Sequence, residues 1–494
     1  MVAIKRKPLP LHLEIQRRRG NPIGLIRSSF RENGKVKHST HGRITGLTLE
    51  QLKLVQAAFR GDVVPKGSAE DGSKLALSNQ WKNTALWELS GVEDKVDVDL
   101  HCYLPMDRLL ERQSAIQRTL AARHLQDGHL VLYDITTSYF EGAYTQSDIV
   151  TFGYNRDGKR GHEQMVIALL CTAEGCPVGV EVFAGNTQDA STVPEKIAQL
   201  QRQYGLKEII FVGDRGMITK AVADKIKGIE GLHTISALTH RQMVELLERK
   251  VITAELFDEE KIVEVFDPEE PKRRYCLCRN PLTMGREGKT RERLLERTRA
   301  ELDKIAGSKR RASAKTLGAR VGRVLERSKM GKFVRWDVIG GRLSWSFDQD
   351  KITAEKLFDG CYIVSGEVPK EKMAASEVVA SYKKLGLVEE AFRSLKTVQL
   401  EVRPVYHKTD DRIRSHVFLC TLAYYLQWHL KQRLEPLFAA DGTHKDRQWT
   451  VRNVIERLAA IRRDRIVMGT VEFEKVTTPE PDQQTILDYL KVRL

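Results

Sequence analysis

Three acidic residues stand in sequence settings where a carboxylate could take part in chemistry. Asp134 follows the apolar run LVLY, Asp214 lies near the end of EIIFVGDRG, and Glu389 lies in SYKKLGLVEEAFRSLK. Carboxylates that converge on two divalent ions about 3.5–4 Å apart can help to activate an attacking oxygen and to stabilise a leaving one. Magnesium and similar hard ions prefer such oxygen ligands. The three residues are therefore candidates for a catalytic and metal-binding set that carries out phosphoryl transfer.

The two aspartates also have ordinary structural interpretations. A carboxylate on an otherwise apolar strand is costly to bury unless it is paired or binds a metal, which favours a functional role for Asp134. The alternative is that Asp134 caps the turn that follows it. Gly213 and Gly216 flank Asp214 and permit a close approach of the backbone. The alternative for Asp214 is the N-cap of a helix that begins at Met217.

Helical spacing selects Glu389 rather than its neighbour Glu390. An apolar stripe that would bury one face of the helix is formed by Val388, Ala391, Phe392 and Leu395. Glu389 stands with Arg393 and Lys396 at i, i+4 and i+7 along one border of this stripe, where a metal ligand could have two cations behind it to meet phosphate. Taken alone, the segment is equally well explained as a salt-bridged amphipathic helix.

The elements that must position these residues begin near residue 130. Short apolar runs rich in β-forming residues predict strands at 130–136, 164–171, 177–183, 208–212 and 233–238. Helices are predicted at 191–204, with Asp189 as N-cap, and at 218–227. This order implies a mixed sheet flanked by helices, with some parallel neighbours. Ligands of such sheets bind outside the carboxyl ends of strands, where Asp134 and Asp214 are expected.

The rest of the chain has a different pattern. A β-hairpin that turns at Asn33-Gly34 is predicted over residues 23–45, and helical patterning leads up to about residue 125. Further strands are predicted at 261–266, 274–279 and 361–366, further helices at 371–385 and 388–400, and a helical tail with a basic patch at 462–465. We therefore divide the chain into an N-terminal region with a β-hairpin and helices (1–125), a core in two parts (126–240 and 356–430), a basic insertion (241–355) and a helical tail (431–494).

The charge of the chain points to a polyanionic partner. Its 494 residues carry a net charge of +15, and residues 286–332 alone hold 16 Lys and Arg against 6 Asp and Glu. Such a local excess suits contact with nucleic acid phosphates, for which Arg310 and Arg311 are candidates, although a solvated helical hairpin is the alternative. The apolar run 417–426 is too short to span a bilayer. No signal peptide is evident, and seven scattered cysteines suit a cytoplasmic protein without a membrane partner.

The sequence resembles the insertion-sequence transposases of the IS4 superfamily, most closely the IS1634-like group. The matching stretches are YDITTSYFEG, GYNRDGKRGHEQMVIAL, GNTQD at 185–189, FVGDRGM, DGCYIVSG and VEEAFRSLKTVQLEVRPVYH. In that superfamily the third acidic residue lies in the pattern Y-x2-R-x3-E-x6-K. Tyr382, Glu389 and Lys396 match this pattern, whereas Leu385 occupies the position of the Arg. Arg393, one turn beyond the glutamate, is a possible substitute.

The resemblance implies a fold and a set of roles. The implied fold class is α/β, with an RNase H-like mixed-sheet catalytic core, an inserted α+β domain and a helical and hairpin N-terminal region. Asp134, Asp214 and Glu389 are implied to hold two Mg²⁺ or Mn²⁺ ions, and Tyr382 and Lys396 to contact DNA near the cleaved end. The implied partners are double-stranded DNA, as element ends and as target, and a second copy of the chain.

Two rival functions remain open at the level of sequence. The first is a decayed transposase that only binds DNA, which the departure at Leu385 favours; it would need no divalent metal and would tolerate the loss of any one acid. The second is a structure-selective nuclease of the same core fold, which would cut junctions or hybrids without strand transfer. Trp336 and Trp345 in the insertion could stack on a displaced base, although packing inside the insertion is the simpler explanation.

Overall fold

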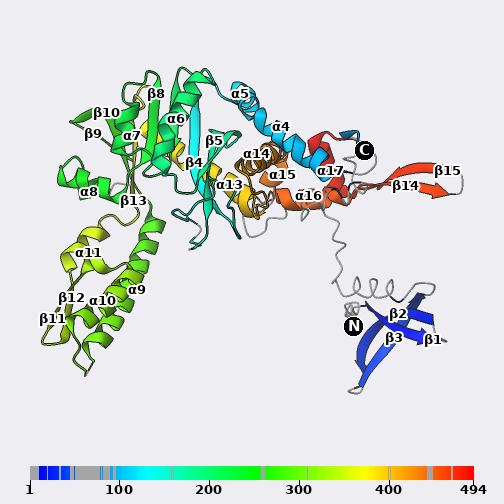
Figure 1. Ribbon diagram of the computed structural model, residues 1–494, viewed down its shortest axis with the longest axis horizontal. Helices are drawn as coiled ribbons and strands as arrows, with labels where there is room; N and C mark the ends of the chain where they lie inside the picture. Colours follow the sequence, from blue (N-terminus) through cyan, green and yellow to red (C-terminus); the bar gives the residue numbers. More distant parts are fainter. Residues whose placement is uncertain are drawn as a thin grey trace, which may run out of the picture. The chain divides into compact units, whose positions relative to one another are not determined.

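The chain divides into two compact units, Met1–Val98 and Asp99–Leu494. Figure 1 shows the computed structural model, in which the elements of each unit can be followed by colour. The structure describes residues 11–18, 21–32 and 35–44, a few single positions between 49 and 92, and residues 96–494 apart from 157, 160, 258–261, 309, 399, 401, 442–448 and 469–470.

The described part of the first unit is a three-stranded antiparallel sheet. Its strands are β1 (Leu11–Arg18), β2 (Asn21–Glu32) and β3 (Lys35–Ile44), in the order β1-β2-β3. The predicted hairpin is confirmed as β2 and β3, whereas its Asn33-Gly34 turn lies outside the described residues. The sequence analysis does not predict β1, although Leu11, Leu13 and Ile15 alternate with polar residues as a half-buried strand requires.

The second unit is built on one mixed sheet of eight strands, which runs in the order β6-β5-β4-β7-β8-β13-β10-β9. The strands are β4 (Leu130–Tyr139), β5 (Gln164–Thr172), β6 (Pro177–Ala184), β7 (Ile209–Gly213), β8 (Leu232–Ala237), β9 (Val263–Asp267), β10 (Glu270–Arg279) and β13 (Cys361–Gly366). Strands β4, β7 and β8 are parallel to one another, and the remaining pairs are antiparallel. The predicted α/β class, with a mixed sheet that has some parallel neighbours, is confirmed.

Helices cover both faces of this sheet. One face packs against the end of α5 (Gln113–His124) and against α6 (Asp189–Arg202) and α7 (Lys220–Ile226). The other face packs against α12 (Ala375–Lys383), α13 (Leu385–Arg393) and α14 (Asp410–Arg433). Because side chains alternate along a strand, Leu130 and Leu132 of β4 meet the second set of helices, and Val131 and Tyr133 meet the first.

The chain between β8 and β13 extends the sheet and adds a separate helical hairpin. Strands β9 and β10 pair into the main sheet, and α8 (His240–Glu248) and η4 (Ala254–Phe257) precede them. The hairpin consists of α9 (Pro281–Ala306) and α10 (Ala314–Ser328), followed by η5 (Gly331–Phe333), β11 (Val334–Ile339), β12 (Arg342–Phe347) and α11 (Gln349–Lys356). Helices α9 and α10 enclose a small apolar core of their own with the β11–β12 pair.

The C-terminal part contains helices, as predicted, and also a β-hairpin, which the prediction of a helical tail misses. After α14 come α15 (Glu435–Ala439), α16 (Val451–Ala459), β14 (Arg463–Met468), β15 (Val471–Val476) and α17 (Pro481–Leu490). The predicted basic patch at 462–465 thus falls largely on β14. Ahead of the sheet, η3 (Asp99–Tyr103) leads into α4 (Leu104–Glu111), which packs against α14. Among the described residues, no helix is long and apolar enough to cross a membrane.

Candidate active site at the carboxyl edge of the sheet

Strand β4 places Asp134 on the sheet face that α12–α14 cover. Asp134 shares this face with Leu130 and Leu132, because alternate residues of a strand point the same way. The strand continues for five residues beyond the aspartate, to Tyr139. Asp134 therefore caps no turn, and that alternative is wrong. Its side chain is 8% exposed, and the Ile135 N–H donates a 2.7 Å hydrogen bond to its Oδ1 atom.

Asp214 lies beside Asp134 at the end of the neighbouring parallel strand. Tyr133 of β4 pairs with Gly213 of β7, so the two aspartates follow directly from paired residues. Asp214 is the first residue after β7, and its backbone carbonyl accepts hydrogen bonds from Ser236 Oγ at 3.1 Å and from the Met217 N–H at 3.1 Å. Helix α7 is capped instead by Thr219, whose side chain accepts a hydrogen bond from Val222 N–H at 3.3 Å. The helix-cap alternative for Asp214 is therefore wrong.

Helix α13 brings Glu389 to the same site. Its predicted apolar stripe is confirmed in the core beneath β4, where Val388 and Ala391 are fully buried. Glu389 is exposed at the border of this stripe and is close enough to Asp134 for its charge to affect the pKa of that residue. Glu390 instead forms an ion pair with Lys431 at 2.6 Å. Of the two adjacent glutamates, the one that spacing selects is the one whose charge acts on Asp134.

The surroundings of Asp134 disfavour its ionised form. The pKa of Asp134 is raised to about 7, chiefly by burial and also by the charges of Asp214 and Glu389, although the Ile135 N–H and the Arg156 guanidinium act to lower it. A divalent cation bound by oxygen ligands would relieve both the burial cost and the mutual repulsion. In the described part of the chain, no three His, Cys, Asp or Glu side chains converge into a ready-made metal cage. The donor set is nevertheless hard, anionic and confined to one face, which fits magnesium or manganese.

Tyr382 joins the site from α12. Its hydroxyl donates a 3.2 Å hydrogen bond to Asp214 Oδ1. Burial and the charge of Asp214 raise the pKa of the Tyr382 phenol well above its ordinary value, so the proton stays on the phenol. Leu385, which stands where the superfamily pattern has Arg, is 6% exposed and belongs to the core under β4. A cation at that point in α13 would be buried among apolar side chains, so this position contributes packing rather than charge.

The remaining predicted DNA-contacting residues lie at different distances from the carboxylates. Arg393 is exposed at the end of α13, and Lys396 is half-buried in the π-helical turn η6 (Ser394–Val398) that follows. Arg310 and Arg311 are exposed in the connection between α9 and α10, so the structure does not bring them to the carboxylates.

The two tryptophans of the insertion are directly opposite each other on β11 and β12. Trp345 packs in the apolar core of the hairpin and edge-on against Phe347, whereas Trp336 is 40% exposed. Packing inside the insertion thus accounts for Trp345.

Arg156 is a site residue that sequence reasoning misses. Its guanidinium donates to the Ile135 carbonyl, next to Asp134, and forms an ion pair with Asp189. The prediction that Asp189 is the N-cap of α6 is wrong, because Gln188 occupies that position and Asp189 turns to the arginine. The sequence signal was the joint presence of GYNRD and GNTQD, two stretches that are far apart along the chain and meet only in the fold.

The part of the chain that carries these residues matches a known protein family. The family model described as "Transposase DDE domain" matches residues 129–426, a span that begins just before β4, ends within α14 and includes all three carboxylates. No curated protein matches the chain.

Among solved structures, the chain is similar to the Mos1 transposase paired-end complex with the left transposon end, at 15% identity and a TM-score of 0.16, over 37% of this chain and 51% of that one. It is also similar to the piggyBac transposase synaptic complex with hairpin DNA, at 10% identity and a TM-score of 0.26, over 79% and 76% of the two chains. The match thus spans about half the length of the Mos1 chain, and the assignment of residues rests on the geometry of this chain alone.

Proposed function

Because the chain belongs to the family of transposase DDE domains, we propose that it is a DNA transposase that binds the terminal inverted repeats of an insertion sequence. In this proposal Asp134, Asp214 and Glu389 hold two Mg²⁺ or Mn²⁺ ions for strand cleavage and strand transfer. The observation that supports it is that Asp134 and Asp214 follow directly from paired residues of two neighbouring parallel strands, with Glu389 of α13 near enough for its charge to act on Asp134.

The residues of the chain prepare this site for phosphodiester chemistry. When bound, the two ions would activate the attacking oxygen and stabilise the leaving one. Asp134 is fixed by its strand and by a backbone hydrogen bond, so it supplies a carboxylate that does not have to be ordered when DNA arrives. Tyr382 fixes one oxygen of Asp214 and leaves the other available as a ligand. The same set can use water or a DNA 3′-hydroxyl as nucleophile, and no covalent protein–DNA intermediate is required.

A basic stripe on α9 supports DNA as the partner. The stripe consists of three exposed residues, Arg286, Lys289 and Arg293, which line a surface depression of about 560 Å³. Their spacing of three and four residues puts them on one side of the helix. Within the described residues, no carboxylate pairs with any of the three, which leaves them available to phosphate.

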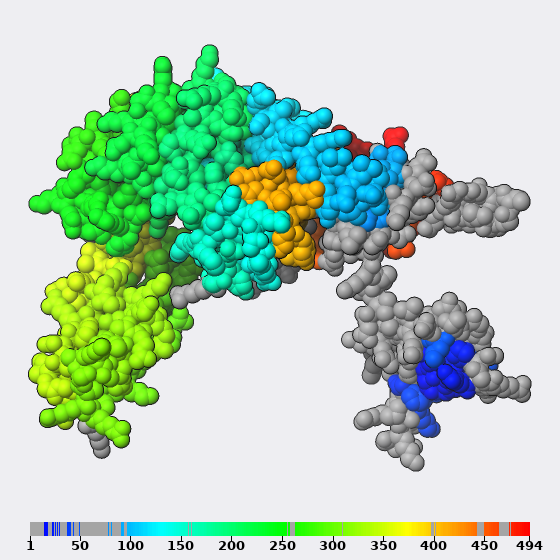
Figure 2. Space-filling model, in the orientation of Figure 1, coloured from blue at the N-terminus to red at the C-terminus, as the bar shows by residue number. Residues whose placement is uncertain are grey.

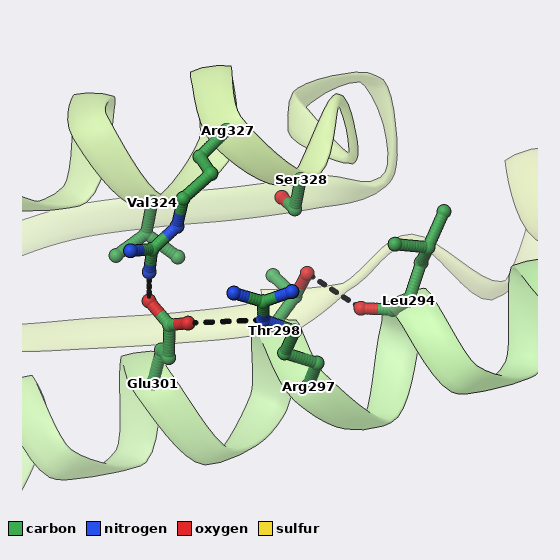
Figure 3. Close-up of a pocket in the computed structure, with 7 residues that line it drawn as sticks. All are labelled: Leu294, Arg297, Thr298, Glu301, Val324, Arg327 and Ser328. Atoms are coloured by element: carbon green, nitrogen blue, oxygen red, sulfur yellow. Dashed lines mark hydrogen bonds and ion pairs between the residues drawn. The ribbon is translucent and has the colours of Figure 1, made fainter. Parts of the chain in front are cut away.

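Other arginines of the hairpin serve its structure instead. Arg291, on the opposite side of α9, is buried and forms a two-pronged ion pair with Asp359, with one bond of 2.6 Å. Arg327 of α10 and Arg297 of α9 both pair with Glu301, as Figure 3 shows. The chain thus separates cations that hold the hairpin together from cations that face solvent.

The basic stripe begins at the same edge of the sheet as the carboxylates. Strand β10 ends where β13 begins, and β13 begins beside the carboxyl end of β8, the parallel neighbour of β7. Helix α9 follows β10 directly, and its Glu287 accepts a hydrogen bond from Gly360 N–H at 2.8 Å. Three strand spacings separate β7 from β10, or about 14 Å. DNA whose cleaved phosphate lies at the carboxylates would therefore pass near the start of α9, and the stripe lies on the following turns of that helix.

The proposal also assigns roles to more distant parts. The N-terminal sheet and the exposed pair Arg310 and Arg311 would add contacts to phosphate, and Arg393 and Lys396 would contact DNA near the cleaved end. A dimer that pairs the two element ends would place one carboxylate set at each end, with target DNA as the second substrate. Affinity from such phosphate contacts falls as salt is raised.

The test is excision from a plasmid that carries this gene with its native flanking DNA, in the presence of Mg²⁺. Wild type is compared with Asp134→Ala and Glu389→Gln, and with Glu390→Gln as a matched control. Glu390 is adjacent in sequence but pairs with Lys431, away from the aspartates. We expect metal-dependent release by wild type and by Glu390→Gln, and at least a hundredfold loss in the other two variants with binding to the flanks retained.

Other results would favour the rival functions. Binding of the flanks by folded wild type without release at any divalent metal concentration would indicate a DNA-binding protein that has lost catalysis. Metal-dependent cutting of branched DNA without preference for the element ends, and without joining, would indicate a nuclease. Equal activity of Glu389→Gln and Glu390→Gln would remove Glu389 from the site.

A further inference from the structure

The segment between β4 and β5 exposes aromatic rings beside the proposed active site. Phe152 is 65% exposed and Tyr154 is 85% exposed. Both lie at or next to the stretch GYNRDGKRGHEQ, which the carboxylate chemistry leaves unexplained. In Figure 2 the turquoise part of the chain, which follows β4, forms a lobe on the visible face. Contact of large apolar rings with water is unfavourable, and neighbouring exposed rings often mark a binding surface.

The backbone that carries these rings is held firmly. A Cβ atom added to Gly153 would lie 2.0 Å from the Gly185 carbonyl oxygen, so only glycine permits this approach of two segments. The fully buried Gln164 donates from Nε2 to the carbonyls of Tyr154 at 3.0 Å and of Gly185 at 2.8 Å. Because Gly153 faces this packed side, Phe152 and Tyr154 on either side of it face solvent.

Arg156 ties the same segment to the catalytic strand. Its backbone N–H donates to Thr137 Oγ1 at 3.3 Å, and its guanidinium donates to the Ile135 carbonyl, one residue from Asp134. The ion pair with Asp189 fixes the guanidinium from the other side. Tyr154, two residues before Arg156, is therefore held beside the part of β4 that continues past Asp134.

Cations and a further aromatic residue surround this lobe. Lys159 and Arg403 lie 5.6 Å and 4.8 Å from the centre of the Tyr139 ring, at the end of β4. Lys408 lies 3.7 Å from the centre of the Tyr144 ring, and the nearby Tyr406 is 74% exposed. Tyr144 is buried and Tyr139 half-buried, so the exposed rings here are those of Phe152, Tyr154 and Tyr406. Exposed rings with cations nearby suit single-stranded nucleic acid, whose bases stack on aromatic faces and whose phosphates meet cations.

We propose that Phe152 and Tyr154 form a stacking platform for unpaired DNA nucleotides next to the cleaved phosphate. The inference rests on the proposed function for the position of that phosphate. A base inside a duplex stacks on its neighbours and offers no free face, so the platform acts on nucleotides that have left the helix. Its role is to hold the separated strand end in place while the carboxylates act, and it reads no particular sequence because every base has a stacking face.

The experiment uses a hairpin oligonucleotide duplex with a four-nucleotide single-stranded tail that carries 2-aminopurine, beside the same duplex with a blunt end. Binding of the full-length protein is measured in Ca²⁺ by 2-aminopurine quenching and by competition. Phe152→Ala, Tyr154→Ala and Tyr154→Phe are compared with wild type, and Tyr489→Ala on α17 serves as the control because Tyr489 is also an exposed tyrosine, at 40%.

We expect wild type to quench the tail and to bind the tailed duplex more tightly than the blunt one. Tyr154→Ala should weaken binding of the tailed duplex by about 5- to 150-fold, the range for the loss of one stacked base, with blunt-duplex affinity within about threefold. Tyr154→Phe, which keeps the ring, should retain the preference, and Tyr489→Ala should match wild type. Unchanged blunt-duplex affinity also shows that the variant is folded.

Two results would overturn the platform: no quenching or tail preference in wild type, or a preference that persists in both alanine variants. The measurement needs no catalysis, so its outcome is separate from that of the proposed function. Tail stacking that depends on Tyr154, in a protein that shows no metal-dependent cleavage, would support the platform and count against the transposase proposal. Cleavage of either duplex that depends on Asp134 but not on Tyr154 would support the transposase proposal and count against the platform.

Discussion

Replacing Asp134 by Asn should stabilise the metal-free protein while abolishing catalysis. The two side chains have nearly the same shape, so packing under β4 is preserved and only the ionisable group is lost. In the wild type the pKa of Asp134 is raised from the ordinary 3.8 to about 7, chiefly by burial and then by the charges of Asp214 and Glu389. Because the folded pKa lies above the unfolded one, the free energy of unfolding falls as pH rises from about 4 to about 7 and levels off above that.

The magnitude follows from this displacement. A change from 3.8 to about 7, at about 1.4 kcal/mol for each tenfold change in proton affinity, sets a ceiling of about 4 kcal/mol. Asp214 and Glu389 are both exposed, so water reaches the site and weakens the repulsion. We therefore expect Asp134→Asn to raise the free energy of unfolding by about 2 kcal/mol at pH 8 and by less than about 0.5 kcal/mol at pH 4.

The assay is urea unfolding in EDTA at pH 4, 6, 7 and 8, followed by circular dichroism and compared at equal m-values. Exposed Asp224 on α7 provides the control variant, Asp224→Asn, which should change stability by less than about 0.5 kcal/mol at every pH. Adding Mg²⁺ should then stabilise wild type more than Asp134→Asn, because ligands that bind only the folded state raise its stability.

Either of two results would refute this reasoning. Asp134→Asn could be less stable than wild type at pH 8, which would mean that the carboxylate is well solvated or paired in the metal-free protein. The difference between the two proteins could also be the same at pH 4 and pH 8, which would assign it to packing rather than to ionisation. If Asp134→Asn loses catalysis without becoming more stable in EDTA, Asp134 keeps its proposed catalytic role. The explanation that its buried charge destabilises the metal-free protein would then be wrong.

Three further predictions concern single features of the structure. Tyr382→Phe should lower the cleavage rate about fivefold, because Asp214 loses a hydrogen bond worth about 1 kcal/mol. The Mg²⁺ concentration needed for half-maximal rate should rise, and an unchanged metal dependence would contradict this prediction. Neutralising all three cations of the α9 stripe should reduce the slope of log affinity against log salt by about 2.7, as a filter-binding salt series would show; an unchanged slope would remove the stripe from the interface. Asp359→Ala should lower the free energy of unfolding, measured in urea, by about 3–5 kcal/mol because it leaves Arg291 buried without its partner. Replacing both residues by apolar ones should recover most of that loss.

The core of the fold could be predicted from sequence because its signals are local. Each of the five strands at 130–136, 164–171, 177–183, 208–212 and 233–238 is a short apolar run, and the structure has a strand at each, with ends shifted by at most three residues. The strand that carries Asp134 is longer than its apolar run suggests. It continues through Thr136–Tyr139, because that polar-looking stretch is buried against β5 and pairs with it up to Gln164.

Elements that depend on partners distant in sequence were harder to predict. Strands β11 and β12 are an exception, because they pair with each other across the Gly340-Gly341 turn, whose two positive φ angles are a local hairpin signal that the prediction missed. Asp189 has the sequence setting of an N-cap, and only the fold shows that its carboxylate forms an ion pair with Arg156. A cap competes with an ion pair whose other member lies 33 residues away, and no local pattern decides between them.

The carboxylates and the platform illustrate two different relations between stability and function. Asp134 is a charge in the wrong place for folding, and the fold tolerates it because the surrounding sheet is large and fully buried on both sides. The exposed rings of Phe152 and Tyr154 are also unfavourable, yet their backbone is among the most tightly packed in the unit, with Gly153 and Gly185 in contact. In both places an unfavourable side chain is held by a well-determined backbone. Geometry of this kind keeps functional groups positioned for a ligand, and the segment that carries the two rings is hydrogen-bonded through Arg156 to the strand that carries Asp134.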